Sequence, residues 1–319
     1  MQHRNDDMLL FIAIGDAVAA ATEFVKVREY PRLFENILRL DGYYQHPTHH
    51  DLKPRMYTDD TQMSVAVAEA LIEHHELLSG RKVTKKYFFE MLNVMITFHR
   101  FEEIFAEAWV RTFHRDPRNG YAKGFQLFLE KTETAKSFLT NIRPYSEKNG
   151  ACMRAVPLGM IQYPEAILAV AEGQARTTHD TPIGIFSAQV VALMSHFALY
   201  RDDPFDRLQD FLEIHLSDSI QLHQMSIHKR WRGPVKSPAT NTVHAVFDLL
   251  THCKTLSEVL RGAIQFGGDT DSVAAIALGI ASARMPNDLP QVLFDKLENG
   301  PYGREYLKTL GKQLMDKYT

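Results

Sequence analysis

Apolar residues recur at intervals of three and four along most of this 319-residue sequence, and this helical period limits its fold more than any other feature. In segment 64–72 they line one side, and Glu69 lies on the other. Alternating runs of β-branched and aromatic residues bounded by hairpin turns, which are typical of strands, do not occur. The sequence therefore predicts an all-α fold, with helices over residues 64–72, 87–99, 125–138, 182–200, 242–250, 256–266, 272–283 and 306–318.

The breaks between these predicted helices are short and rich in proline, glycine and asparagine, as at 116–120 and 148–150. At about 150 residues per domain, the length permits two domains or one large domain. The sequence contains no low-complexity segment, linker-like stretch or fixed-period repeat that would divide it. We therefore predict a single all-α domain over residues 1–319. The alanine-rich segment 274–283 further predicts helix backbones that approach each other closely.

Charge and composition narrow the class of protein. Lysine and arginine number 36 and aspartate and glutamate 39, a formal net charge of −3, which argues against a protein that coats nucleic acid. An apolar fraction of 45% and a charged fraction of 24% are typical of a soluble globular chain. The short basic stretch 229–232 is therefore predicted to be a solvated loop, and we expect no nucleic-acid partner.

The compartment is predicted from the cysteines and the apolar stretches. Cys152 and Cys253 are far apart and form no C-x-x-C pair, which favours a reducing cytoplasm. The apolar stretch 8–14 follows two aspartates instead of the basic leader of a signal peptide. Stretch 182–200 contains serine, glutamine and histidine, unlike a bilayer span. We therefore expect a cytoplasmic protein, monomeric and without a membrane partner.

The first candidate functional motif is Tyr-Thr-Asp-Asp-Thr at 57–61, directly before a predicted helix. One interpretation is a helix N-cap, in which a threonine or aspartate side chain accepts from the first backbone N–H groups. A cap uses a single side chain, however, and here Asp59 and Asp60 are adjacent. The cap therefore explains one of the two carboxylates and leaves the other unexplained.

A second group, Gly-Gly-Asp-Thr-Asp-Ser at 267–272, opens another predicted helix with two carboxylates. Carboxylate and hydroxyl oxygens are the ligands of hard divalent cations such as Mg²⁺, Mn²⁺ and Ca²⁺. Four carboxylates brought together without a cation would repel one another strongly, and one or two divalent ions would remove that repulsion. The recurrence of the pattern therefore favours a metal site over two unrelated helix caps.

Two further acids leave alternatives open. Asp16 is predicted to open an alanine-rich helix, which would place Glu23 two turns further along the same face. Asp16 could cap the helix or hydrogen-bond locally, and Glu23 could be a solvated residue. Their spacing alone does not decide between these interpretations and a place in the same site.

Short blocks occur in a fixed order between about residues 11 and 285. They are Gly-Asp-Ala and Glu-Phe (15–17, 23–24), Tyr-Thr-Asp-Asp-Thr-x-Met (57–63), Gly-Tyr (120–121), Asn-Gly-Ala-x-Met-Arg-x-x-Pro-Leu-Gly (149–159), Thr-His (178–179) and Gly-Gly-Asp-Thr-Asp-Ser-Val-Ala-Ala-Ile-Ala (267–277). In this order they resemble the ADP-ribosylglycohydrolase family, which includes ADP-ribosylarginine hydrolases and dinitrogenase-reductase-activating glycohydrolases. The Thr-Asp-Asp and Gly-Gly-Asp-Thr-Asp blocks together are highly specific.

The resemblance implies a compact all-α fold around a centre of two Mg²⁺ or Mn²⁺ ions. The implied metal ligands are Thr58, Asp59, Asp60, Asp269, Asp271 and Ser272. Glu23 would lie beside the metals as an acid/base or gating carboxylate, and the implied catalytic residues are Glu23, Asp60 and Asp271. The implied contacts with ADP-ribose are Gly120, Tyr121, Asn149, Gly150, Ala151, Met153 and His179.

The chain departs from the family pattern at three positions. Ser272 stands where threonine is common, which keeps a hydroxyl ligand. Ala122 stands where many members have the second glycine of a Gly-Tyr-Gly loop, and Lys148 replaces a glycine often found before Asn149. The last two changes fall in loops expected to touch substrate, so they leave the hydrolase class intact but bear on substrate identity.

The function implied by the resemblance is metal-dependent hydrolysis of the bond between ADP-ribose and a protein side chain, with arginine as the expected acceptor. One alternative keeps the chemistry but acts on serine-linked or O-acetyl-ADP-ribose. Another is an immunity or binding protein that occludes an ADP-ribosylating toxin. The expected partners are an ADP-ribosylated protein or ADP-ribose itself, with a cognate ADP-ribosyltransferase as a further candidate.

Overall fold

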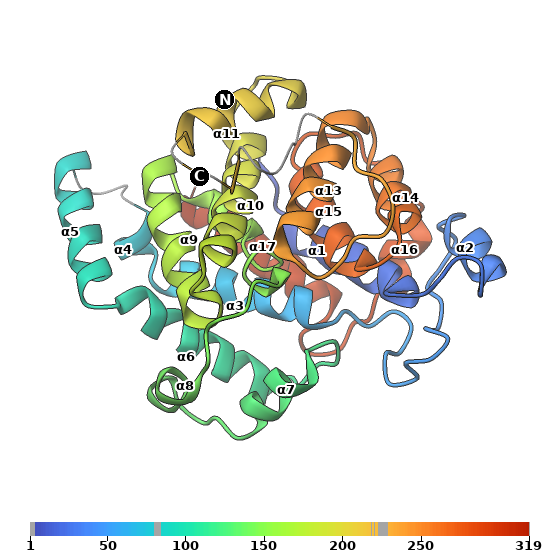
Figure 1. The fold of residues 1–319 in the computed structure, drawn as a ribbon, viewed down its shortest axis with the longest axis horizontal. Helices are drawn as coiled ribbons and strands as arrows, with labels where there is room; N and C mark the ends of the chain where they lie inside the picture. Colours follow the sequence, from blue (N-terminus) through green and yellow to red (C-terminus); the bar gives the residue numbers. More distant parts are fainter. Residues whose placement is uncertain (1–3, 80–83, 218, 220, 223–228, 319) are drawn as a thin grey trace.

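The structure is a computed structural model that describes residues 4–79, 84–217, 219, 221–222 and 229–318. Over these ranges it contains helices and loops but no strand, which confirms the predicted all-α fold (Figure 1). The α-helices are α1 Met8–Ala19, α2 Pro31–Ile37, α3 Asp59–Glu73, α4 His75–Leu78, α5 Lys85–Thr97, α6 Arg100–Arg115, α7 Lys123–Glu130, α8 Ala135–Asn141, α9 Pro164–His179, α10 Pro182–Tyr200, α11 Leu208–His215, α13 Ala239–His252, α14 Leu256–Phe266, α15 Thr270–Ala281, α16 Gln291–Lys296 and α17 Arg304–Tyr318. Short 3₁₀ turns are η1 Ala20–Thr22, η2 Asn149–Ala151, η3 Val156–Met160 and η4 Phe205–Arg207.

The core is built around α1 and α15, whose residues are all buried. Figure 1 shows these two helices in the interior, with α5 and α2 near opposite ends of the molecule. Helices α3 and α17 pack against α1, while α14 and α13 pack against α15. Apart from Asp16 in α1 and the polar residues that begin α15, both central helices are apolar on every side, as expected for helices with no face toward solvent.

The close approach of α1 and α15 depends on small residues. A Cβ atom on Gly15 would lie 2.5 Å from the backbone oxygen of Ala274, and one on Gly279 would lie 2.5 Å from the Ile12 side chain. Hydrogen in place of a side chain lets the two backbones meet without a clash. This confirms the close packing predicted from the alanine-rich segment 274–283.

A Gly15→Ala substitution is expected to lower the free energy of unfolding by about 1–3 kcal/mol, because the new methyl group must displace the backbone of α15. Urea denaturation measures this change. The control is Gly124→Ala in the first turn of α7, where a Cβ meets no atom within 4 Å and alanine is the better helix former. Equal stability of the two variants would contradict the proposed tight contact.

Three sequence predictions need correction. Residue Asp16 lies late in α1 and does not open a helix, and Glu23 follows η1, so the two do not share a helical face. The predicted helix 125–138 is two helices, α7 and α8, because the Thr134 side chain accepts a hydrogen bond from the Ser137 N–H and starts a new helix. Helices α6 and α9 were not among the predicted segments.

Helix α10 is long and apolar enough to cross a membrane, and it is the one described helix that meets both criteria. Of its most apolar 18-residue window, 78% is buried inside the protein. Its polar residues Ser187, Ser195 and His196 are buried as well. These observations agree with the predicted role of α10 as a core helix.

Candidate active site

The first wall of the site is the start of α3, which is held by Asp16 of α1. The fully buried Asp16 carboxylate accepts hydrogen bonds from the Thr58 N–H (2.9 Å), the Thr58 hydroxyl (2.9 Å), the Thr61 N–H (3.1 Å) and the Thr61 hydroxyl (2.6 Å). Thr58 is the N-cap residue but accepts no capping hydrogen bond. Asp16 thus takes over the capping task, so Asp59 and Asp60 are free for another use. The helix-cap interpretation of this pair is wrong.

The second wall is the start of α15. Asp269 is its N-cap residue, and its side chain likewise accepts no capping hydrogen bond. Its carboxylate instead accepts from the Asn149 amide (3.1 Å), and its N–H donates to the Val235 carbonyl (3.0 Å). The Asp271 carboxylate accepts from the Ser272 N–H (3.0 Å). The loop before α15 is therefore anchored to two distant segments, which fixes where its carboxylates lie.

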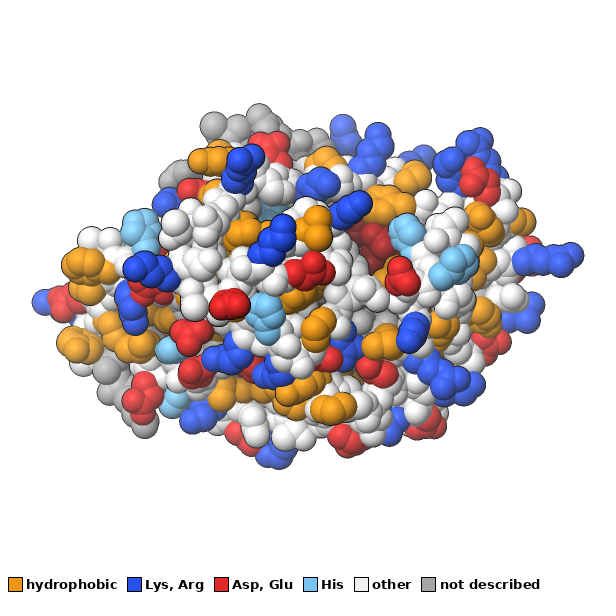
Figure 2. Space-filling model, turned by 90° about the horizontal axis from the view of Figure 1, so that it is seen from below, with side chains coloured by type: hydrophobic (Ala, Val, Ile, Leu, Met, Phe, Trp, Pro, Cys, Tyr) orange, Lys and Arg blue, Asp and Glu red, His pale blue; other side chains and the backbone are white. Residues whose placement is uncertain are grey.

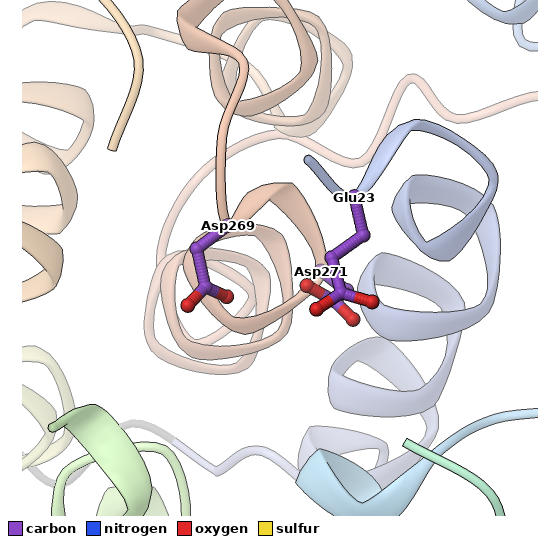
Figure 3. Close-up of side chains that lie close together, drawn as sticks. All are labelled: Glu23, Asp269 and Asp271. Atoms are coloured by element: carbon purple, nitrogen blue, oxygen red, sulfur yellow. The ribbon is translucent and has the colours of Figure 1, made fainter. Parts of the chain in front are cut away.

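Glu23 is brought to the same place by the turn after α1. Hydroxyl groups of Thr22 and Thr270 lie 3.1 Å apart and tie this turn to α15. Carboxylate oxygens of Glu23, Asp269 and Asp271 all lie within 4.8 Å of one another. Figure 3 shows these side chains reaching a common region from two separate segments of the chain.

These carboxylates open into a cavity of about 730 Å³. Figure 2 shows acidic side chains at the bottom of a hollow on this face, with histidines beside it. The two departures from the family pattern, Ala122 and Lys148, line the cavity too. Sequence-predicted site residues that line it are Glu23, Asp59, Asp60, Gly120, Asn149, Gly150, Met153, His179, Asp269, Asp271 and Ser272.

Three sequence-predicted site residues do not line the cavity. The Thr58 hydroxyl donates to Asp16, as described above. Tyr121 is buried, and its hydroxyl donates to Gln62 (2.7 Å). Ala151 is fully buried, and its carbonyl accepts from the Gln174 amide (2.8 Å). The structure therefore places these residues behind the site as its supports.

Gly120 has a specific structural role beside Asp59. Its φ of +110° is a conformation that side-chain-bearing residues rarely adopt, and a Cβ there would lie 2.2 Å from an Asp59 carboxylate oxygen. The Asp59 N–H also donates to the Asn119 carbonyl (3.1 Å). The Gly-Tyr block therefore packs directly on the acidic pair.

Burial and mutual repulsion dominate the electrostatics of the site. Burial, followed by the charges of Asp269 and Asp16, raises the pKa of Glu23 to about 8. Burial and neighbouring carboxylates raise the pKa of Asp59, Asp60 and Asp271 well above the ordinary value of 3.8. Burial raises the pKa of Asp16 to about 6. These carboxylates are therefore costly to ionise together unless a positive charge joins them.

The donor set fits a hard divalent cation. One carboxylate oxygen of Asp60 is buried and accepts no hydrogen bond from any residue that the structure describes. The neighbouring donors from Asp59, Asp269, Asp271 and Ser272 are carboxylate and hydroxyl oxygens. Oxygen donors of this kind are the preferred ligands of Mg²⁺ and Mn²⁺.

Several cavity residues were not predicted from the sequence, and three of them matter most for the chemistry: Arg154, Thr178 and Phe24. Arg154 and Thr178 lie within quoted blocks but received no role, and Phe24 was quoted only beside Glu23. Arg154 is 1% exposed and stacks on the Trp109 ring at 3.8 Å, whereas Phe24 is 54% exposed at a φ of +50°. A buried arginine in the motif could have been flagged, but the Phe24 conformation has no sequence signal.

Comparison with known proteins agrees with the architecture and the residue blocks. Residues 3–319 match the family described as ADP-ribosylglycohydrolase. An ADP-ribosyl-[dinitrogen reductase] glycohydrolase of Rhodospirillum rubrum is 25% identical over 91% of this chain and 88% of its own length. An ADP-ribosylarginine hydrolase of Serratia proteamaculans is 23% identical over 96% of this chain and 77% of its own length.

The fold itself has a solved counterpart. A structure titled "ADP-ribosylglycohydrolase-related protein complex" superimposes with a TM-score of 0.71, covers 100% of this chain and 99% of its own, and is 23% identical. That likeness extends over all of the helices described above. Together with the match over residues 3–319, it shows that this chain belongs to the ADP-ribosylglycohydrolase family.

Proposed function

We propose that this protein hydrolyses the bond between ADP-ribose and a modified protein side chain, and that the side chain is arginine. The observation that carries the proposal is the convergence of five buried or half-buried carboxylates, from three separate segments, in one cavity of about 730 Å³. The relatives from Rhodospirillum rubrum and Serratia proteamaculans are both named as hydrolases of ADP-ribosyl groups. The cavity volume lies within the range of small-ligand sites.

The proposed cofactors are two Mg²⁺ or Mn²⁺ ions. Their ligands would be Asp59, Asp60, Asp269, Asp271 and Ser272, which line the cavity. Thr58 would be a further ligand through its hydroxyl oxygen, whose hydrogen is donated to Asp16. Bound ions would offset the repulsion among the carboxylates and orient the ribose hydroxyls and the attacking water. The orphaned oxygen of Asp60 supports this assignment, because a cation is the partner that it lacks.

The chain's own residues would then act on the departing side chain. Departure of the acceptor leaves positive charge on the ribose ring, as in other glycoside cleavages. The carboxylates of Asp60 and Asp271 would stabilise that charge. Glu23, whose pKa is raised first by burial, lies beside these carboxylates and could give a proton to the leaving atom.

Phe24 supports arginine as the acceptor. It lines the cavity beside Glu23, and its N–H donates to the Gly268 carbonyl (2.7 Å). The preceding carbonyl, of Glu23, lies 3.0 Å from the His46 ring nitrogen Nε2. A bulky residue at positive φ stores strain, which persists only where the surroundings fix it. An exposed ring beside a carboxylate matches a planar guanidinium group, which stacks on aromatic faces.

The alternatives make different predictions. A serine-linked or O-acetyl acceptor carries no cation and would gain nothing from Phe24. An immunity protein that blocks a toxin by occlusion would need neither metal nor carboxylates. The test is a panel of arginine-linked, serine-linked and O-acetyl-ADP-ribose, each assayed for product release with Mg²⁺, Mn²⁺ or a chelator. We expect metal-dependent release from arginine; release that ignores the chelator would overturn the metal proposal, and preference for another linkage would overturn the arginine assignment.

A Phe24→Ala substitution is expected to raise KM for the arginine-linked substrate by about 5- to 10-fold, the effect of losing a cation–π contact. For the serine-linked substrate the change should stay below about twofold. Steady-state kinetics on both substrates measure the difference. The control is Tyr30→Ala, another exposed aromatic, which does not line the cavity. An equal change for both linkages would show that Phe24 does not contact the acceptor.

We also propose a cytoplasmic location and a monomeric state, with an ADP-ribosylated protein as the partner and a cognate ADP-ribosyltransferase as the source of the modification. Cys152 and Cys253 are both free thiols, which supports a reducing compartment. Light scattering of the purified protein tests the monomer, and fractionation of cells tests the location.

A further inference from the structure

A hydrogen-bonded chain of three side chains ends at the cavity. The Arg154 guanidinium donates through Nη2 to the Thr178 hydroxyl (2.7 Å) and through Nε to the Gln174 amide oxygen (2.7 Å). The Thr178 hydroxyl lies 2.7 Å from Nδ1 of His179. Arg154, Thr178 and His179 all line the cavity. None of the described carboxylates forms an ion pair with Arg154, whose guanidinium instead stacks on the Trp109 ring.

Arg154 determines which arrangement of hydrogen bonds satisfies every group in the chain. A guanidinium can only donate, so the Thr178 oxygen must accept from it. The described partners of the Thr178 hydroxyl are Arg154 and His179. Its single hydrogen can therefore be satisfied only by donation to Nδ1 of His179. Nδ1 accepts, so the ring proton of the neutral imidazole is on Nε2.

The surroundings also keep His179 neutral. A proton on Nδ1 would reverse that hydrogen bond and leave the Thr178 hydroxyl hydrogen without an acceptor among its described partners. Burial, followed by the Arg154 charge, lowers the pKa of His179 to about 3. A neutral imidazole at physiological pH is a poor general acid, which leaves that task to Glu23.

The Nε2 edge of the ring is turned toward the substrate loop. A Cβ on Gly150 would lie 2.7 Å from Cε1 and 3.0 Å from Nε2, so a glycine is needed for the loop to pass the ring. No residue that the structure describes hydrogen-bonds to Nε2, and Gly150 itself lines the cavity. The tautomer set by Arg154 thus leaves one N–H donor available at the cavity wall.

We propose that Arg154 and Thr178 are positioning residues that hold His179 as a neutral imidazole with its Nε2–H available to an acceptor oxygen of the bound ADP-ribose. The identity of the ligand in this inference rests on the proposed function, whereas the tautomer of His179 does not. A donor that cannot lose or gain a proton near neutral pH suits a phosphate or ribose oxygen, because its hydrogen bond is independent of pH.

The first experiment is nitrogen NMR of the full-length protein with ¹⁵N-labelled histidine, with His179→Asn used to assign the signals. We expect the His179 signals of the Nε2–H tautomer, unchanged between about pH 6 and 8. A Thr178→Val variant, which keeps the shape but loses the hydroxyl, should show a mixture of tautomers, and Thr178→Ser should restore the single form. An Nδ1–H tautomer in the unchanged protein would overturn the proposal.

The second experiment compares kinetics of the same variants. Thr178→Val is expected to raise KM for the ADP-ribosylated substrate about 3- to 10-fold, the worth of one hydrogen bond, with kcat within about twofold. Thr178→Ser should restore KM. If Thr178→Val does not fold, Arg154→Lys replaces it and should likewise raise KM. Unchanged KM in a folded variant with mixed tautomers would refute the contact between His179 and substrate. Absence of turnover in the unchanged protein would refute the proposed function, whereas the NMR result on the tautomer would still stand.

Discussion

An Asp271→Asn variant is expected to release ADP-ribose from a modified arginine on the order of 100-fold more slowly than the unchanged protein. The substitution keeps the size of the side chain in the first turn of α15 but removes a buried negative charge. Loss of the Asp271 charge should not destabilise the fold. Burial and the charges of Glu23, Asp60 and Asp269 raise the pKa of Asp271, so a neutral amide relieves repulsion when no cation is present. Product release in the presence of Mg²⁺ or Mn²⁺ measures the effect on activity. Thermal unfolding in chelator measures the effect on stability.

A matched control separates this effect from a general loss of acid. Asp210→Asn makes the same change in the first turn of α11, where the side chain is 62% exposed and pairs with Arg207. Activity should be unchanged and stability should shift by no more than about 0.5 kcal/mol. Full activity of Asp271→Asn would reject the carboxylate mechanism. If the Asp271→Asn variant still protects a target from an ADP-ribosylating toxin, that result would instead favour the occlusion alternative.

The helices could be predicted where an amphipathic period has clear ends. Helix α14 runs from Leu256 to Phe266 as predicted, with Thr255 accepting a hydrogen bond from the Glu258 N–H at its start. Helix α1 has no polar face and no side-chain cap, so nothing in the sequence marks where it begins. For that reason Asp16 was placed at a helix start when it lies near the end.

The acidic residues of the site could also be predicted, because two helix starts repeat the same unusual pair. The hydrogen bonds that hold these acidic residues in place could not be predicted. The hydrogen bonds from Thr58 to Asp16 join residues 42 positions apart, and that of Asn149 to Asp269 joins residues 120 positions apart. Contacts of this kind depend on how α1, α3 and α15 pack, which no local pattern encodes. Tyr121 was misplaced for the same reason, since its hydrogen-bond partner Gln62 lies in α3, 59 positions away.

In chelator, the protein is expected to become less stable as pH rises from about 5 to 8, and an excess of Mg²⁺ or Mn²⁺ should remove this loss. The pKa of Asp16 is raised from 3.8 to about 6 and that of Glu23 from 4.5 to about 8. Between the ordinary and the raised values, the folded chain keeps protons that the unfolded chain has released. Raising pH through that window therefore favours unfolding. Scanning calorimetry across the pH range measures the trend.

The effect of the cation should have the opposite dependence on pH, because protons and cations compete for the same carboxylates. An ion at 100 times its Kd stabilises the fold by about 2.7 kcal/mol, which corresponds to a rise in Tm on the order of 5 °C. We expect this gain at pH 8 and a clearly smaller gain at pH 5. Asp271→Asn should reduce both the pH trend and the gain, whereas Asp210→Asn should change neither. A gain of equal size at both pH values would mean that the cation binds away from the carboxylates, because only a site that must first lose its protons links the two.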